Sequence, residues 1–113
     1  MAARVKTIGR DELAQALASG AVVALDAQGE GWFERERLPG AIRARPQDLA
    51  TLEGRLPAGK DTPAAVYCWS ETCAASALTA DCLVELGYRD VRRYVGGKCD
   101  WIEASLPLEG YRT

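Results

Sequence analysis

Two short apolar runs without polar alternation limit what this chain can fold into more than any other feature. Ala21–Leu25 and Ala64–Cys68 each consist entirely of hydrophobic residues. A strand of this kind is covered on both faces, as strands are in a parallel sheet with helices on each side. Neither run approaches the roughly 20 apolar residues that cross a bilayer. We therefore expect two buried strands and no membrane-spanning segment.

Stretches with helical periodicity alternate with these runs. Arg10–Ser19 repeats apolar side chains on one helical face, and Gly20 is a natural end for this helix. After the second run a longer helix that ends at Gly87 is predicted from one apolar face, formed by Ala75, Leu78, Thr79, Cys82, Leu83 and Leu86. Strands that alternate with helices imply right-handed crossovers and a largely parallel sheet.

Shorter elements complete the expected fold. Brief strands are predicted at Val5–Ile8, which would lie at a sheet edge, at Ala41–Arg43 and at Val91–Val95. Short helices are predicted at Glu30–Glu36 and Pro46–Leu56, followed by a loop at Pro57–Pro63. Trp32 and Phe33 are expected to turn inward. The result is an α/β fold, a single domain spanning 1–113, with a mostly parallel central sheet of about five strands and helices on both faces.

The composition excludes several kinds of function. Of all residues 48% are hydrophobic and 27% are charged, which is typical of a folded, soluble protein. The net charge is −2 with both signs interspersed, so the basic stripe of a nucleic-acid binder is missing. The chain contains no histidine, which removes the commonest zinc ligand, the commonest general base and every histidine-activated nucleophile. Thiol chemistry is the main covalent chemistry that remains.

The four cysteines lie in the C-terminal half, at Cys68, Cys73, Cys82 and Cys99. No two of them form the C-x2-C pair that is typical of zinc sites. A secreted disulfide scaffold would be denser in cysteine and would begin with a signal peptide, whereas charged residues interrupt any such segment here. We therefore expect reduced thiols in a cytoplasmic protein that uses no metal and no cofactor.

Cys68 has the best position for chemistry. It ends the second apolar run, and ligands of open α/β sheets bind just past the carboxyl ends of strands. The loop Trp69–Cys73 follows, and the predicted helix begins near Ala74. Backbone N–H groups of such a loop, together with a helix N-terminus, favour the reactive thiolate over the thiol. The alternative interpretation is that Cys68 is simply a small hydrophobic residue that ends a strand.

Several segments occur in an order and spacing typical of one known family. They are Leu25–Ala27, Arg37–Ala41, Val66–Cys68 and three C-terminal stretches, Leu86–Tyr88, Tyr94–Trp101 and Leu106–Gly110. Together they resemble the rhodanese-like (sulfurtransferase) domain, over a core of roughly residues 7–110. Each segment is weak evidence alone, but the combination is specific. The resemblance implies a single rhodanese-like domain with the α/β architecture expected above.

The resemblance also implies a persulfide mechanism. The family's cysteine attacks the outer sulfur of a donor, becomes a persulfide and passes that sulfur to a nucleophile such as cyanide or a thiol. Cys68 occupies this catalytic position. The backbone N–H groups of the active-site loop would surround the persulfide, and this loop consists of Trp69, Ser70, Glu71, Thr72, Cys73 and Ala74. Asp26 and Arg37 would support the loop, Asp26 as a hydrogen-bond acceptor. Arg37 stands where the family usually has a histidine.

The loop departs from the family in its charge. It lacks the arginine that favours an anionic donor such as thiosulfate, and no lysine or arginine occurs between Lys60 and Arg89. Glu71 lies in the loop itself, where its carboxylate would repel a doubly charged donor and oppose the thiolate. We therefore expect weak thiosulfate activity, with a small-molecule or protein donor of thiol-bound sulfur and a thiol acceptor. The sequence leaves open whether Lys98 reaches the site.

Cys73 admits two interpretations, and so does the function. Cys73 is either a thiol that resolves a persulfide or forms a disulfide with Cys68, or only a small residue at the helix start. Cys82 is expected to be inert core, and Trp69 to form a pocket wall or to shield the sulfur. Besides sulfur transfer, a weakly active or inactive regulatory module and a Cys68–Cys73 redox switch are possible functions. The sequence does not determine the oligomeric state.

Overall fold

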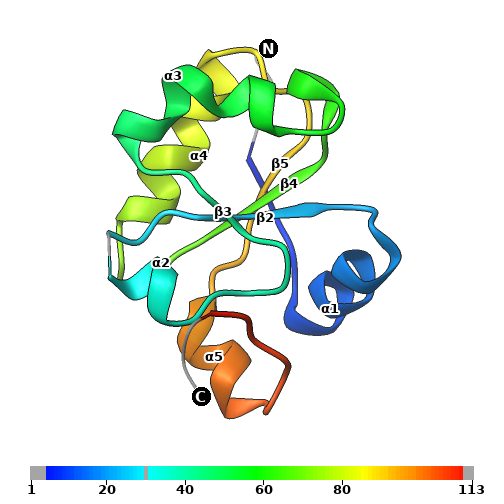
Figure 1. The fold of residues 1–113 in the computed structure, drawn as a ribbon, viewed down its shortest axis with the longest axis vertical. Helices are drawn as coiled ribbons and strands as arrows, with labels where there is room; N and C mark the ends of the chain where they lie inside the picture. Colours follow the sequence, from blue (N-terminus) through cyan, green and yellow to red (C-terminus); the bar gives the residue numbers. More distant parts are fainter. Residues whose placement is uncertain (1–4, 30, 111–113) are drawn as a thin grey trace.

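The computed structural model describes residues 5–29 and 31–110 as alternating strands and helices around one sheet (Figure 1). The strands are β1 (Lys6–Thr7), β2 (Val23–Asp26), β3 (Ile42–Arg43), β4 (Ala64–Tyr67) and β5 (Val91–Arg93). The α-helices are α1 (Arg10–Ser19), α2 (Trp32–Arg35), α3 (Leu49–Leu52), α4 (Ala75–Glu85) and α5 (Gly97–Glu103). Three 3-10 helices are η1 (Pro46–Asp48), η2 (Glu53–Arg55) and η3 (Gly59–Asp61).

The five strands pair in the order β1-β5-β4-β2-β3, and every pair is parallel. The register places Asp26 of β2 opposite Tyr67 of β4, and Val66 opposite Arg93 of β5. The carboxyl ends of these three strands therefore meet at one edge of the sheet. The predicted α/β fold with a parallel sheet of five strands is confirmed, as is the edge position of the first strand.

Each face of the sheet has its own hydrophobic core. On one face, apolar residues of β2, β4 and β5 pack with Leu52 of α3 and with Ala80 and Leu83 of α4. On the other face, alternate residues of β2 and β4, and Tyr94 just after β5, pack with Leu13 of α1 and Trp101 of α5. Figure 1 shows α3 and α4 on the opposite side of the strands from α1. Burial of both faces explains why the two apolar runs lack polar alternation.

The predicted apolar face of α4 is only partly correct. Leu83 and one small polar residue of that face are buried, but Cys82 is exposed, and Leu78 and Leu86 leave 63% and 46% of their surface in contact with solvent. The helix also buries Ala80 and a second small polar residue, which lie outside the predicted face. These polar residues are satisfied by hydrogen bonds, so their burial costs little. The helix is apolar on more than one side, and the spacing alone does not tell which side packs on the sheet.

Two other local predictions need correction. The helix expected at Pro46–Leu56 is split into η1, α3 and η2, and the loop expected at Pro57–Pro63 contains η3. Trp32 does not turn inward but is 53% exposed, whereas Phe33 packs against the core. Adjacent residues of a helix point about 100° apart, so the single turn α2 buries only one of the two rings. Glu30 lies outside the described residues.

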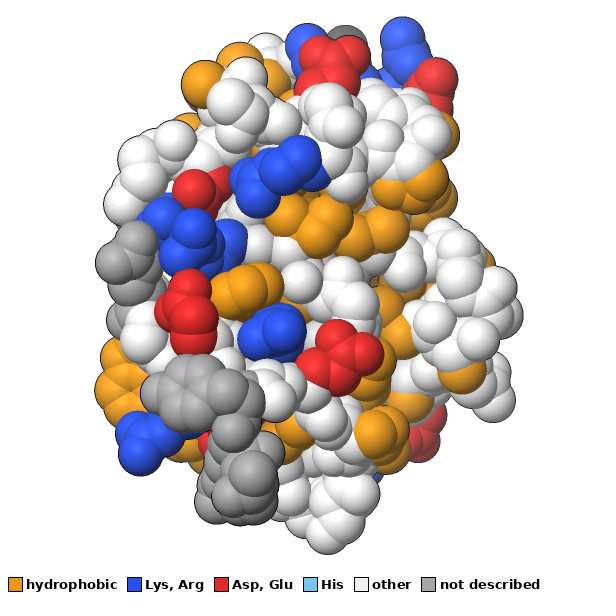
Figure 2. Space-filling view, viewed as in Figure 1, with side chains coloured by type: hydrophobic (Ala, Val, Ile, Leu, Met, Phe, Trp, Pro, Cys, Tyr) orange, Lys and Arg blue, Asp and Glu red, His pale blue; other side chains and the backbone are white. Residues whose placement is uncertain are grey.

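Both signs of charge are mixed on the face of the molecule shown in Figure 2, where Lys and Arg side chains lie beside Asp and Glu. Within residues 5–29 and 31–110, no helix is long and apolar enough to cross a bilayer.

Candidate active site

Cys68 follows β4 directly, in the middle of the sheet and at the edge where the strands end. The end of β2 lies beside Cys68, because the N–H of Ala27, which follows β2, donates to the carbonyl of Tyr67, the residue before Cys68, at 2.9 Å. Only 3% of Cys68 is exposed. The sequence therefore places this sulfur correctly, at the end of a buried strand, and the position follows from burial on both sides of β4.

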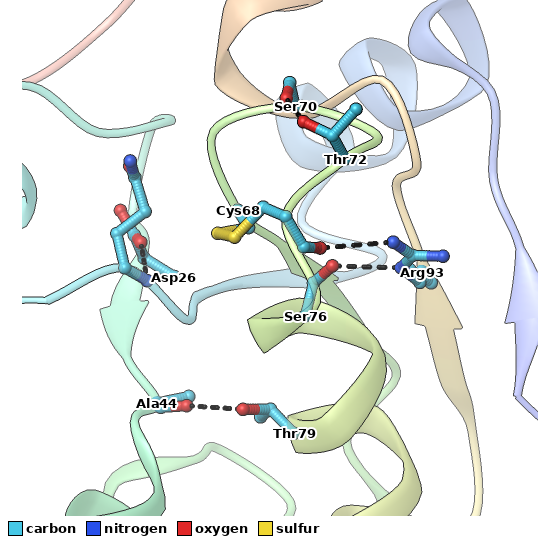
Figure 3. The surroundings of a disulfide bond; sticks show 10 residues. Asp26, Ala44, Cys68, Ser70, Thr72, Ser76, Thr79 and Arg93 are labelled. Atoms are coloured by element: carbon cyan, nitrogen blue, oxygen red, sulfur yellow. Dashed lines mark hydrogen bonds between the residues drawn. A yellow bond between two sulfur atoms is a disulfide. The ribbon is translucent and has the colours of Figure 1, made fainter.

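The loop after β4 curls back and brings Cys73 to Cys68. The two residues form a disulfide, with their Cα atoms 6.2 Å apart, and Figure 3 shows this surrounding. The turn is closed by the Cys73 N–H, which donates to the Ser70 carbonyl at 3.1 Å, and by a 3.0 Å hydrogen bond between the Ser70 and Thr72 hydroxyls. One of the loop N–H groups expected to surround a persulfide is thus already used within the loop.

The start of α5 holds the loop through its backbone. The N–H groups of Lys98 and Cys99 donate to the carbonyls of Cys68 and Trp69 at 2.9 and 2.8 Å. Gly97 adopts a φ of +72°, and a Cβ at this position would lie 2.7 Å from both carbonyl oxygens. Only glycine fits this conformation and this close approach without strain. Gly97 therefore allows the start of α5 to approach the backbone of Cys68 and Trp69 closely.

Arg93 supplies a cation that the sequence of the loop does not contain. It comes from β5, and its guanidinium donates to the Ser76 hydroxyl at 2.9 Å and to the Cys73 carbonyl at 3.5 Å (Figure 3). Arg93 thereby ties the end of the loop and the start of α4 to the sheet. Glu71, which carries the negative charge in the loop, is exposed.

Lys98, whose position the sequence leaves open, lies beside the cysteine loop. Its side chain is buried, and the ammonium donates to the carbonyls of Glu36 and Trp32 at 2.8 and 3.3 Å. The same nitrogen lies 5.9 and 6.0 Å from the ring centres of Trp32 and Trp69, within the range of cation–π attraction. Burial lowers the pKa of Lys98, and the nearby Asp26 carboxylate opposes this shift.

Asp26 accepts hydrogen bonds beside the loop, as expected for a supporting residue. Its two oxygens receive the Gln28 N–H at 2.7 Å and the Tyr67 hydroxyl at 2.8 Å. The Tyr67 oxygen in turn receives the Leu38 N–H at 3.1 Å. Complete burial raises the pKa of Asp26 above its usual range, against the effect of these hydrogen bonds. The network joins β2, β4 and the segment after α2.

Arg37 lies one step further from the sulfur. Its guanidinium donates to the Phe33 carbonyl at 3.2 Å and stacks 4.7 Å from the Phe33 ring centre. Its backbone pairs with Glu109 in an isolated antiparallel bridge. These contacts hold α2 and the C-terminal segment together, so Arg37 supports the wall of the site rather than the cysteine loop.

A cavity of about 610 Å³ opens onto the disulfide. Within residues 5–29 and 31–110, its lining includes no charged side chain and consists of Ala27, Gln28, Gly29, Trp32, Cys68, Trp69, Cys73 and Ala75. Trp32 and Trp69 form one wall, with ring centres 6.5 Å apart and planes tilted by 37°. This size and apolar character are typical of a site for a small molecule.

Gln28 is the polar side chain of this lining, and it is unusual. Only 7% of it is exposed, and its Oε1 is buried without a hydrogen-bond partner. A buried unsatisfied carbonyl costs roughly 1–3 kcal/mol, so such groups are rare in folded proteins. Within the described part of the chain, no group of three or more potential metal ligands is found.

Four residues of the site are not placed by the sequence predictions, which omit Gln28 and Arg93, turn Trp32 inward and leave the position of Lys98 open. Gln28 follows Asp26 by two positions at the end of a buried strand, so its position was a usable signal. The other three reach the loop only because β5, α5 and α2 are its neighbours in space.

Comparisons with known proteins agree with this geometry. A family model, the rhodanese-like domain, matches residues 9–104. The chain is similar in fold to a thiosulfate sulfurtransferase from Pseudomonas aeruginosa, at 22% identity and a TM-score of 0.80, over 96% of this chain and 21% of that one. It is also similar to the rhodanese-like domain of an Anabaena protein, at 20% identity and a TM-score of 0.78, over 95% and 80% of the two chains.

A protein from Bacillus halodurans is similar at 19% identity and a TM-score of 0.79, over 93% of this chain and 77% of that one. A comparison with the sequences of curated proteins gives no match. The likeness to the solved structures shows the fold, and the family model covers most of the chain. The chain therefore belongs to the rhodanese-like domain family.

Proposed function

We propose that the protein is a sulfurtransferase that carries sulfane sulfur as a persulfide on Cys68. In the first step the Cys68 thiolate attacks the outer sulfur of a donor persulfide, R–S–SH, and the donor leaves as the thiolate R–S⁻. In the second step an acceptor thiolate R′–S⁻ attacks the outer sulfur of the Cys68 persulfide. This gives R′–S–SH and returns Cys68 as the thiolate. No cofactor, oxidant or reductant is needed for the cycle.

The observation that carries this proposal is the position of the Cys68 sulfur. It lies at the carboxyl end of the central strand, in a backbone frame fixed by α5, and it lines a cavity of about 610 Å³. A nucleophile in this position meets a bound molecule without a change in the sheet. Membership of the rhodanese-like family is consistent with this chemistry.

The lining of the cavity favours thiol-bound sulfur over thiosulfate. A doubly charged anion needs a cation or several free N–H groups at its binding site, whereas no cationic side chain is found among the described residues that line this cavity. Arg93 and Lys98 are close, but their hydrogen bonds are made to the protein's own hydroxyl and carbonyl groups. We infer a small-molecule or protein persulfide as donor and a thiol as acceptor, with weak activity on thiosulfate.

We also propose that the reaction takes place in the cytoplasm. A reducing compartment returns the Cys68–Cys73 disulfide to the two thiols that the cycle requires.

Intact mass measurement tests the carrier role. The reduced wild-type protein and Cys68→Ser are incubated separately with thiosulfate and with glutathione persulfide. We expect the wild type to gain one sulfur atom, removable by dithiothreitol, with glutathione persulfide more readily than with thiosulfate. Cys68→Ser should gain none. A wild-type mass that neither donor changes would favour a regulatory module without turnover, whereas a loss of two hydrogens would indicate formation of the Cys68–Cys73 disulfide.

The disulfide supports a second candidate function, a switch that uses Cys73. The Cys73 thiolate would attack the inner sulfur of the Cys68 persulfide, forming the Cys68–Cys73 disulfide and releasing hydrosulfide, HS⁻. Two equivalents of an external thiol would then reduce the disulfide and themselves become a disulfide. The observation in its favour is that the loop brings these two residues into bonding contact.

Cys73→Ser separates the two functions. If Cys73 resolves the persulfide, this variant retains the added sulfur on Cys68 and releases no hydrosulfide when the acceptor thiol is left out. If Cys68 only carries sulfur to an external acceptor, wild type and Cys73→Ser transfer it at similar rates, and neither releases hydrosulfide.

A further inference from the structure

The cavity beside Cys68 contains one feature that sulfur transfer by itself does not explain. Gln28 places an amide in an otherwise apolar lining, and its Oε1 is buried without a partner. The backbone N–H of the same residue is used by Asp26, at 2.7 Å, which fixes the start of the side chain. This oxygen has almost no exposed surface of its own, but it belongs to a side chain that lines the cavity. A bound molecule with a hydrogen-bond donor would satisfy it once the amide turns towards the cavity.

The rest of the lining defines what else this molecule must be. Trp32 and Trp69 present two indole rings with centres 6.5 Å apart, which suits the carbon body of an organic molecule. The described residues of the lining include no charged side chain, and the Lys98 ammonium near the two rings is held by two carbonyl oxygens. Transfer of a carboxylate into such surroundings without a partner is strongly unfavourable.

We propose that this cavity binds a neutral organic thiol that carries a hydroxyl or amide N–H donor close to its sulfur. Gln28 is the residue that determines this specificity. The sulfur of the ligand points to Cys68, its carbon body lies against Trp32 and Trp69, and its donor satisfies the Gln28 oxygen. The terminal torsion of a glutamine side chain has a broad energy minimum, so a small rotation of the amide presents the oxygen to the ligand.

The proposal rests on the proposed function in one respect: it makes this thiol the sulfur acceptor. Binding itself requires no reaction, so the two are tested apart. The Cys68→Ser protein binds the thiol without sulfur transfer, and the intrinsic fluorescence of Trp32 and Trp69 reports the binding. Uptake of sulfur by the wild type is measured separately by mass, as above.

Three thiols of similar size serve as probes. 2-Mercaptoethanol and 1-propanethiol differ only by a hydroxyl in place of a methyl group, and 3-mercaptopropionate adds a negative charge. Each is titrated into Cys68→Ser and into the same protein with Gln28→Leu, a change that keeps the volume similar and removes the acceptor. Gln15→Leu, on the exposed face of α1, is the matched control.

We expect Gln28→Leu to weaken the binding of 2-mercaptoethanol by about fivefold relative to that of 1-propanethiol, the usual effect of one hydrogen bond. The control Gln15→Leu should leave the ratio unchanged. 3-Mercaptopropionate should bind at least tenfold more weakly than 2-mercaptoethanol to the protein with Gln28 intact. In turnover assays of the protein with Cys68 intact, with glutathione persulfide as donor, Gln28→Leu should raise the KM for 2-mercaptoethanol by a similar factor with little change in kcat.

The inference is overturned if the ratio of the two neutral thiols is the same with and without Gln28, or if the anionic thiol binds as well as the neutral ones. The comparison of neutral and anionic thiols needs no variant at Gln28, so it decides the matter even where Gln28→Leu does not fold. Selective binding without sulfur uptake by Cys68 would refute the proposed function alone. Sulfur uptake without this selectivity would refute the inference alone.

Discussion

The molecule contains two cavities that each border a cysteine, and they are built in different ways. The cavity at Cys68, of about 610 Å³, has no charged residue in the part of its lining that the structure describes, and its cysteine is 3% exposed. The groove at Cys82, of about 490 Å³, is lined in part by Glu53, Lys60 and Glu85, and its cysteine is exposed. The cysteine side chain is therefore buried among apolar residues at Cys68, whereas at Cys82 it is exposed beside charged residues.

The two sites are also held together by different forces. The loop at Cys68 is fixed by backbone hydrogen bonds from α5 and by the close approach of Gly97. Beside the groove, the segment from η1 to η3 is held by side-chain ion pairs, notably Arg45–Asp48 at 2.8 Å and Lys60–Glu53 at 4.0 Å. Backbone contacts do not titrate, so stability of the two regions should respond differently to substitution and to pH.

Substitution of Gly97 should have the largest effect. In Gly97→Ala the added Cβ would meet two carbonyl oxygens at 2.7 Å in a backbone with φ of +72°. Steric overlap and backbone strain each cost about 1–3 kcal/mol. We expect the free energy of unfolding, measured with urea, to fall by about 3 kcal/mol or more, together with loss of sulfur uptake by Cys68.

Gly54→Ala is the matched control on the other side of the molecule. Gly54 lies in η2, and a Cβ there would have no heavy atom within 4 Å. This variant should unfold within about 0.5 kcal/mol of the wild type. Equal unfolding midpoints for Gly97→Ala and Gly54→Ala would show that the approach of α5 does not hold the cysteine loop.

The sequence predicts the position of Cys68 better than it predicts the walls of the cavity around it. The parallel sheet and the position of Cys68 follow from local features, because an apolar run without alternation predicts a buried strand and a nucleophile at its end. The walls of the cavity do not follow in this way. Trp32 forms a wall only because α2 lies beside the cysteine loop, and Arg93 reaches this loop only because β5 lies next to β4. Both depend on how the elements pack in space, which is a property of the whole fold.

The orientation of α4 shows a second limit. Leu78, Cys82 and Leu86 are as apolar as the residues that the helix buries. The side of α4 that packs on the sheet contains Ser76 and Thr79. The Ser76 hydroxyl accepts a hydrogen bond from Arg93 at 2.9 Å, and the Thr79 hydroxyl donates one to the Ala44 carbonyl at 3.3 Å (Figure 3). Such small polar residues look exposed in a sequence, and only their partners make their burial favourable.

An effect of intermediate size is expected at the ion pair beside the groove. The Arg45 side chain donates two hydrogen bonds to Asp48, and the Arg45 N–H donates a third. The hydrogen-bonded guanidinium lowers the pKa of Asp48 from 3.8 to about 2. The carboxylate therefore stabilises the fold above pH 4, and this contribution disappears as the pH falls towards 2.

Asp48→Asn should lower the free energy of unfolding by about 2 kcal/mol at pH 7, and by progressively less between pH 4 and pH 2. Urea unfolding at a series of pH values checks this, with the exposed Asp81→Asn on α4 as the control that should differ little from the wild type. A deficit of Asp48→Asn that stays constant down to pH 2 would mean that the charge of Asp48 is not what stabilises the segment.

The smallest effect is expected at Cys82, and it gives the sharpest contrast between the two cysteines. Because Cys82 is exposed on α4 and makes no disulfide, Cys82→Ser should change the free energy of unfolding by less than about 0.5 kcal/mol and leave sulfur uptake unchanged. In the oxidised native protein, iodoacetamide should label Cys82 while Cys68 and Cys73 stay protected by their disulfide. If Cys82→Ser instead impaired sulfur uptake as strongly as Cys68→Ser, the groove would belong to the same reaction as the cavity. The contrast between the buried Cys68 and the exposed Cys82 would then not correspond to a difference in function.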